Sequence, residues 1–189
     1  MIIASQKRKE NIAEYILYMW QIEDLIRANN FDIESIERNV IDKFNLDADA
    51  RKEMVQWYES LIDMMRREDV TKQGHLQINK NVLAALVDLH RALLADPRFS
   101  DYSAEFYKTL PFIVELRSKG GDNPAGEIET CFNALYGMLL MRLQSKEVSA
   151  DTAAAIRQIS HFMAVLAHYF RLNDEGRLFD EDGGESASK

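Results

Sequence analysis

Apolar residues recur at steps of three and four along most of this 189-residue chain. An early example is the set Met54, Tyr58, Leu61 and Met65, which this spacing places on one face of a helix. Together with capping and helix-breaking residues, the pattern predicts helices over residues 5–29, 32–44, 47–70, 76–95, 100–119, 124–146 and 149–172. The fourth of these begins near Leu76 or Asn79.

Polar residues mark several of the predicted helix starts. Three side chains precede apolar runs and can cap them: Asp32, Asp47 and Ser149. Asn123 is expected to cap the sixth helix, with Pro124 at its first position. Pro111 lies in the middle of the fifth segment, where it removes a backbone donor. We therefore expect a kink or a break there.

The last two predicted helices carry matching apolar stripes joined by a short link, which indicates an antiparallel hairpin. Gly137 lies inside the first of the two, and a glycine there is best explained by the close approach of another helix. The predicted fold is an all-α, single-domain bundle of six to seven helices over residues 1–172. Residues 173–189 form an acidic tail that we expect to be mobile.

The charge balance argues against nucleic-acid binding. The net charge is −8, and the basic run Lys7–Arg8–Lys9 is read as a solvated helical turn. The single cysteine, Cys131, cannot form an internal disulfide and is read as a buried thiol. No signal peptide and no apolar stretch of membrane-spanning length occur in the sequence, so we expect a cytoplasmic protein without membrane contact.

The histidines do not form a recognisable metal motif. His161 and His168 share a helix face opposite the apolar stripe, and Gln158 and Val165 occupy the positions where a di-iron bundle would carry glutamates. The sequence also lacks a phosphate-binding loop and a nucleophile elbow. We therefore expect no metal and no cofactor, and we lean against an enzyme.

Two ionisable residues lie on apolar helix faces. His90 lies in the middle of an apolar arc, and it is either a core histidine with a hydrogen-bond partner or part of a pocket. Glu14 aligns with Gln21 beside Tyr18, and it is the acid we expect to be partly buried. The hypothesis is a ligand pocket shared by Glu14 and His90, with Gln21 and Tyr18 beside them.

Trp20 lies between Asp24 and Arg27 on the helical wheel, apart from the main apolar arc. It is either an interface residue together with Arg27 or a tryptophan covered by its own chain.

Two parts of the chain resemble a known family. They are residues 1–15 with 19–27, and Glu127–Ile128–Glu129–Thr130–Cys131 followed by residues 135–140. The chain resembles a family of bacterial proteins of about this length described as a domain of unknown function. The resemblance implies a bacterial helical protein and carries no activity or site.

The function expected from these features is that of a non-enzymatic helical interaction protein that associates with itself or with an unknown protein partner. The alternative is an enzyme or small-molecule-binding protein with a pocket between helices that involves Glu14 and His90.

Overall fold

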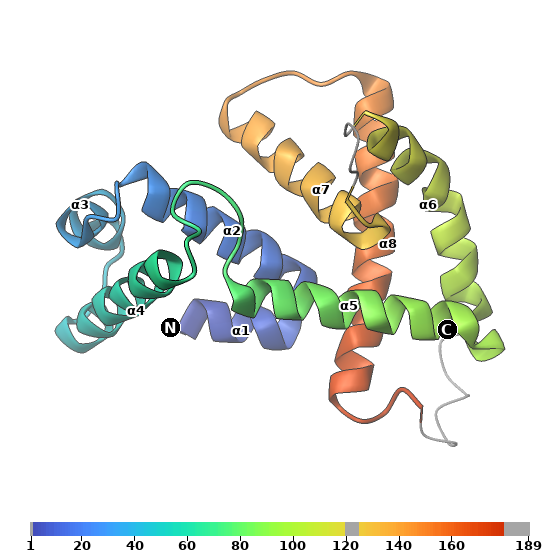
Figure 1. Ribbon diagram of the computed structural model, residues 1–189, viewed down its shortest axis with the longest axis horizontal. Coiled ribbons are helices and arrows are strands. Elements are labelled where there is room, and N and C mark those ends of the chain that lie inside the picture. Colours follow the sequence, from blue (N-terminus) through green and yellow to red (C-terminus); the bar gives the residue numbers. More distant parts are fainter. Residues whose placement is uncertain (1, 120–124, 180–189) are drawn as a thin grey trace. The chain divides into compact units, whose positions relative to one another are not determined.

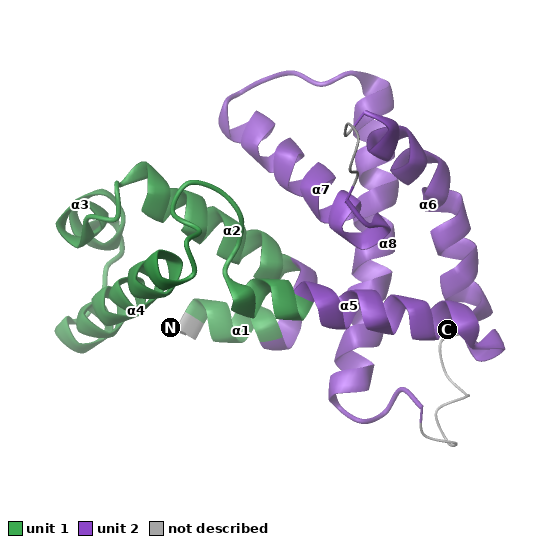
Figure 2. Ribbon diagram, in the orientation of Figure 1, with its two compact units in different colours: residues 1–8, 14–82 green, residues 9–13, 83–189 purple. Residues whose placement is uncertain are grey.

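The computed structural model describes residues 2–119 and 125–179, and the predicted all-α class is confirmed (Figure 1). Within these residues the chain forms eight α-helices and two short 3₁₀ turns, without a β-strand. The helices group into two compact units, which are described separately (Figure 2). Unit 1 comprises Met1–Arg8 with Glu14–Val82, and unit 2 comprises Lys9–Ala13 with Leu83–Lys189. That residues 1–172 fold as one domain stays a prediction.

Unit 1 is built mainly from the first four helices and the beginning of the fifth. Two of the predicted N-caps are present here: Asp32 accepts a hydrogen bond from the backbone N–H of Glu34, and Asp47 from that of Ala50. The elements are α1 (Ile2–Glu10), α2 (Ile12–Ala28), α3 (Ile33–Asn39), a 3₁₀ turn (Ile41–Lys43), α4 (Ala48–Arg67) and the first residues of α5 (Gln77–Ala95).

The single N-terminal helix predicted over residues 5–29 is wrong, because the chain interrupts it at Asn11. The Asn11 side chain accepts a hydrogen bond from the backbone N–H of Ala13, which caps α2 locally and ends α1. The predicted stop after α2 is confirmed. Asn30 and Phe31 adopt positive φ angles of 54° and 59°, in the left-handed conformation that commonly follows a helix.

Unit 2 contains the rest of α5 and three further helices. Helix α8 contacts both α6 and α7, and its predicted seam is buried at Ile159, Met163 and Leu166. Ser149 caps α8 as predicted, accepting from the backbone N–H of Thr152. The elements are a 3₁₀ turn (Pro97–Phe99), α6 (Ser100–Ser118), α7 (Glu127–Leu143) and α8 (Ala150–Asp174). The antiparallel geometry of α7 and α8 stays a prediction.

Helix α6 continues through Pro111, so the predicted break does not occur. Thr109, which is buried, donates a hydrogen bond from its hydroxyl to the carbonyl of Glu105 and accepts one from Gln158 of α8. Contact with α8 thus holds the helix together where the proline weakens it locally.

The ends of α7 and α8 differ from the predicted ones. Helix α7 begins at Glu127 after Gly126, later than expected, and the predicted cap at Asn123 and Pro124 lies outside the described residues. Helix α8 continues to Asp174. Beyond it Leu178 is buried, so the chain packs further than residue 172. Residues 180–189 of the predicted tail also lie outside the described residues.

Candidate functional sites

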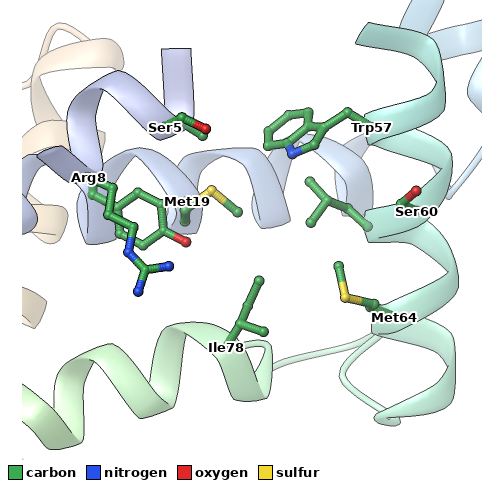
Figure 3. A pocket seen from close by; sticks show the side chains of 10 residues that line it. Ser5, Arg8, Met19, Trp57, Ser60, Met64 and Ile78 are labelled. Carbon is green, nitrogen blue, oxygen red and sulfur yellow. The ribbon is translucent and has the colours of Figure 1, made fainter. Parts of the chain in front are cut away.

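Unit 1 contains an apolar groove of about 180 Å³ between α1, α2, α4 and the start of α5 (Figure 3). Its buried lining residues include Met19 and Leu61, each 2% exposed, and Tyr15, 6% exposed. Trp57 and Met64 line it from α4 and Ile78 from α5, and these three keep partial or full exposure. Apolar side chains that stay accessible around a concavity are the usual lining of a ligand site.

The polar groups of this groove include a cation and no acid. Ser5 and Arg8 line it from α1, Tyr15 from α2 and Ser60 from α4. Arg8 is exposed, and among the described residues no carboxylate lies within ion-pair distance of its guanidinium. Its guanidinium carbon lies 5.9 Å from the centroid of the Tyr15 ring. Burial raises the pKa of Tyr15. The positive charge of Arg8 opposes this rise, because it stabilises the ionised phenol.

A buried carboxylate, Glu23, organises the loop before α5. Glu23 is 0% exposed. Its Oε2 lies 2.6 Å from Nδ1 of His75, while Oε1 accepts hydrogen bonds from the backbone N–H of Leu76 at 2.9 Å and from Nδ2 of Asn79 at 2.7 Å. Glu68 accepts from the next backbone N–H, that of Gln77, at 2.6 Å. Two carboxylates therefore satisfy donors at the start of α5, where the helix dipole favours negative charge.

Helix α2 carries both Glu14 and Glu23, and sequence reasoning expected the wrong one of these two acids to be buried. Glu14 is exposed and forms an ion pair of 2.9 Å with Lys7, whereas Glu23 is the buried carboxylate. A signal for Glu23 was present in the sequence. It continues the seam formed by Ile16, Met19 and Ile26, all at most 2% exposed, at helical steps of three and four.

The two predicted interface residues contact their own unit. Trp20 is 3% exposed, and its ring stacks on His75 with centroids 4.1 Å apart and planes 12° from parallel. Arg27 forms an ion pair of 2.7 Å with Asp24 and donates to the backbone carbonyls of Val70 and Gly74. Of the two interpretations of Trp20, the structure favours the tryptophan covered by its own chain.

The other predicted ligand residues of α2 are half-buried. Nζ of Lys7 lies 5.9 Å from the centroid of the Tyr18 ring. Burial raises the pKa of the Tyr18 phenol. Neither Tyr18, Gln21 nor Glu14 lines the groove of unit 1. Glu14 belongs to unit 1 and His90 to unit 2, and the hypothesis of a shared pocket stays a prediction.

His90 is a buried histidine of the aromatic core of unit 2. Its side chain is 3% exposed, and its Nδ1 lies 2.6 Å from the hydroxyl oxygen of Tyr102. The rings of Phe106 and Phe162 meet it edge-on, with centroids 4.8 Å and 6.0 Å away. It has the hydrogen-bond partner expected of a core histidine.

The second ring nitrogen of His90 has no hydrogen-bond partner among the described residues. Oε2 of Glu127 lies 3.9 Å from this Nε2, beyond hydrogen-bond range. Burial, and secondarily the charge of Arg91, lowers the pKa of His90 to about 4. On α7, Cys131 is 0% exposed, and burial raises the pKa of its thiol to about 12. A neutral imidazole and a protonated thiol are the stable forms at pH 7, which fits a structural role for both.

The second half of α7 is apolar around its whole circumference and yet remains accessible. Residues 134–141 (Ala-Leu-Tyr-Gly-Met-Leu-Leu-Met) include no charged side chain, and each of them keeps intermediate exposure. Leu143, just beyond, is 71% exposed. Helices that are apolar all round are normally covered on all sides. This segment, hereafter the α7 segment, departs from that rule.

Gly137 does not have the environment that its position suggested. A Cβ atom built at Gly137 would meet no atom within 4 Å, so the described chain makes no close approach to it. The close approach of another helix, predicted at this position, is therefore not made by the described chain.

His161 and His168 are exposed, as their position opposite the seam predicted. Within residues 2–119 and 125–179, no group of three or more histidine, cysteine, aspartate or glutamate side chains has an arrangement that could hold a metal ion. No helix in the described part of the chain has both the length and the apolar character needed to cross a bilayer.

Within the described residues, the fold is all-helical and includes the buried polar residues Glu23 and His90, the apolar groove of unit 1 and the accessible apolar α7 segment. A family model described as a domain of unknown function, DUF4924, matches residues 1–177, and the chain belongs to this family. A search of curated proteins finds no match, and a search of solved structures finds none.

Proposed function

We propose that this protein is a non-enzymatic interaction protein that forms homodimers, with the α7 segment of one copy packed against that of the other. The observation that carries the proposal is the continuous accessibility of eight uncharged residues in one helix. Contiguous apolar surface of this kind marks a protein–protein contact in soluble proteins.

The absence of charge in the α7 segment favours a second copy as its partner. Each chain carries a net charge of −8, so two copies repel one another unless the contacting surfaces are neutral. A two-fold contact also requires a surface that is complementary to itself. An uncharged helix face meets both conditions. No charged side chain loses its water in the contact, and no charged side chain faces the identical residue of the second copy.

Gly137 supports the same arrangement. A glycine inside a helix costs about 1 kcal/mol relative to alanine, and nothing in the described chain packs against it. A helix of a second chain crossing at Gly137 would use the missing side chain, since two backbones approach more closely there. The proposal places the protein in the bacterial cytoplasm, supported by the single, buried cysteine and by the sequence resemblance.

Light scattering after size exclusion tests the proposal. At tens of micromolar, the unmodified protein is expected to show about twice its chain mass of 21.8 kDa. Gly137→Leu separates the crossing helices, and Leu143→Glu adds repelling charges beside them, so both should give the chain mass. Neither change should unfold unit 2, because Gly137 has open space around it and Leu143 is exposed.

Tyr107→Glu is the matched control. Tyr107 is another exposed apolar residue of unit 2, 63% accessible, but it lies on α6. Its replacement should leave the dimer intact. An unmodified protein that stays at the chain mass, or dimers that persist in both α7 variants, would contradict the proposal.

A further inference from the structure

The groove of unit 1 has an unusual distribution of charge. Its lining includes one cation, Arg8, and no carboxylate, although the whole chain has more acids than bases. The acids near α1 do not neutralise it. Glu14 is paired with Lys7, and Arg8 itself has no ion-pair partner among the described residues.

The groove combines buried apolar side chains with a single cation on its α1 side. Met19 and Leu61 close it from within, and Trp57, Met64 and Ile78 offer accessible apolar surface (Figure 3). The guanidinium of Arg8 lies on the α1 side of the groove, across from α4. A molecule that satisfies both parts needs an apolar body and an anionic group at one end.

The size of the groove limits the apolar body. Its volume of about 180 Å³ is close to that of an engineered cavity of about 150 Å³ that holds benzene. One six-membered ring or a short branched chain therefore fills it. Longer acyl chains would extend into solvent.

The single cation selects among anions. A guanidinium binds a carboxylate with two parallel hydrogen bonds. A phosphate dianion carries more charge than one arginine balances, and the lining supplies no second cation. Trp57 adds an aromatic face beside the apolar body, on which a ring can stack.

We propose that the groove of unit 1 binds a small monocarboxylate with an aromatic or branched apolar body, whose carboxylate pairs with Arg8. Binding at this groove uses residues of α1, α2, α4 and α5, and none of the α7 segment. The proposal is therefore independent of dimer formation, and either can fail without the other.

Isothermal titration with 3-phenylpropionate and its neutral amide, 3-phenylpropanamide, tests the proposal on the full chain. The acid should bind, and the amide should bind at least tenfold more weakly because it cannot form the ion pair. Arg8→Gln should reduce the affinity for the acid by tenfold or more and leave that for the amide unchanged. Ser60→Phe should abolish binding of both, because Ser60 lines the groove from α4 and its replacement fills it.

Arg67→Gln is the matched control for charge. Arg67 is an exposed arginine of the same unit, with a side chain 80% accessible, and it does not line the groove. Its replacement should leave the affinity unchanged. Binding that is equal for acid and amide, binding that survives Ser60→Phe, or no binding of the acid at millimolar concentration would each overturn the proposal. Because Arg8 and Ser60 are exposed, circular dichroism should show the same helical content in all variants.

Discussion

Units 1 and 2 each bury an ionisable side chain with a distinct hydrogen-bonding environment, Glu23 in unit 1 and His90 in unit 2. In unit 1, the carboxylate of Glu23 has three hydrogen-bond partners, from His75, Leu76 and Asn79. In unit 2, the imidazole of His90 bonds to Tyr102, and its second nitrogen has no hydrogen-bond partner among the described residues. Aromatic rings surround the rest of it.

The two environments have different consequences for the fold and for stability. A buried carboxylate is tolerated only where donors converge on it, so Glu23 specifies the path of the loop that leads into α5. A buried imidazole can instead stay neutral, so it needs no charged partner. The first centre determines local geometry, while the second is expected to make the stability of unit 2 depend on pH.

The largest effect is expected from Glu23→Ala. The substitution leaves the backbone N–H of Leu76 and the amide of Asn79 without an acceptor in a buried site. We expect a loss on the order of 4 kcal/mol in the free energy of unfolding, measured by urea denaturation. Glu14→Ala, on the exposed face of the same helix, is the matched control and should cost less than about 1 kcal/mol. Similar losses for the two variants would contradict the assignment of Glu23 as the organising acid.

A smaller effect is expected from pH. His90 has a pKa of about 4 in the folded protein, against 6.5 as its ordinary value. Between these values the unfolded chain binds more protons than the folded one, so stability falls as the pH is lowered from 6.5 to 4. Above pH 6.5 His90 contributes no dependence.

The expected loss from His90 over that window is up to roughly 3 kcal/mol. The carboxylate of Glu127 lies 3.9 Å from Nε2 of His90. A closer approach of this carboxylate to the protonated ring would make the loss of stability smaller. Urea denaturation at a series of pH values measures the loss. The double variant His90→Phe with Tyr102→Phe lacks the imidazole and should show a smaller fall. An equal fall in both proteins would rule out His90 as the source.

The smallest effect is expected in the coupling between His90 and Tyr102. Tyr102→Phe and His90→Phe each leave one buried group without its partner, whereas the double variant removes both groups. We expect the loss in free energy of unfolding of the double variant to be smaller than the sum of the two single losses by about 1 kcal/mol. A double-mutant cycle at pH 7 measures this energy. A coupling energy of zero would mean that the 2.6 Å contact adds nothing to stability.

Sequence reasoning located the helices better than the side chains that matter within them. The N-caps at Asp32, Asp47 and Ser149 were predicted from residue type alone, since capping depends on neighbours a few positions away. The burial of His90 was also predicted, because its apolar arc is a property of one helix. Both are local features.

The environments of Glu23 and Gly137 could not be predicted from their own helices. The burial of Glu23 depends on donors more than fifty positions away, at His75 and Asn79, and no helical wheel of α2 includes them. Gly137 was expected to face another helix, and the described chain leaves it open. The groove of unit 1 combines side chains of four helices, so its composition could not be assembled from any single segment.

Hydrophobic spacing and capping residues were enough to specify an all-helical chain and most helix starts, because hydrogen bonds and side-chain contacts within a helix connect residues three or four apart. Which acid is buried, which tryptophan is covered and which apolar helix stays accessible depended on contacts between segments distant along the chain. Such contacts are set by the packing of one helix on another, which many sequences with the same periodicity can satisfy in different ways.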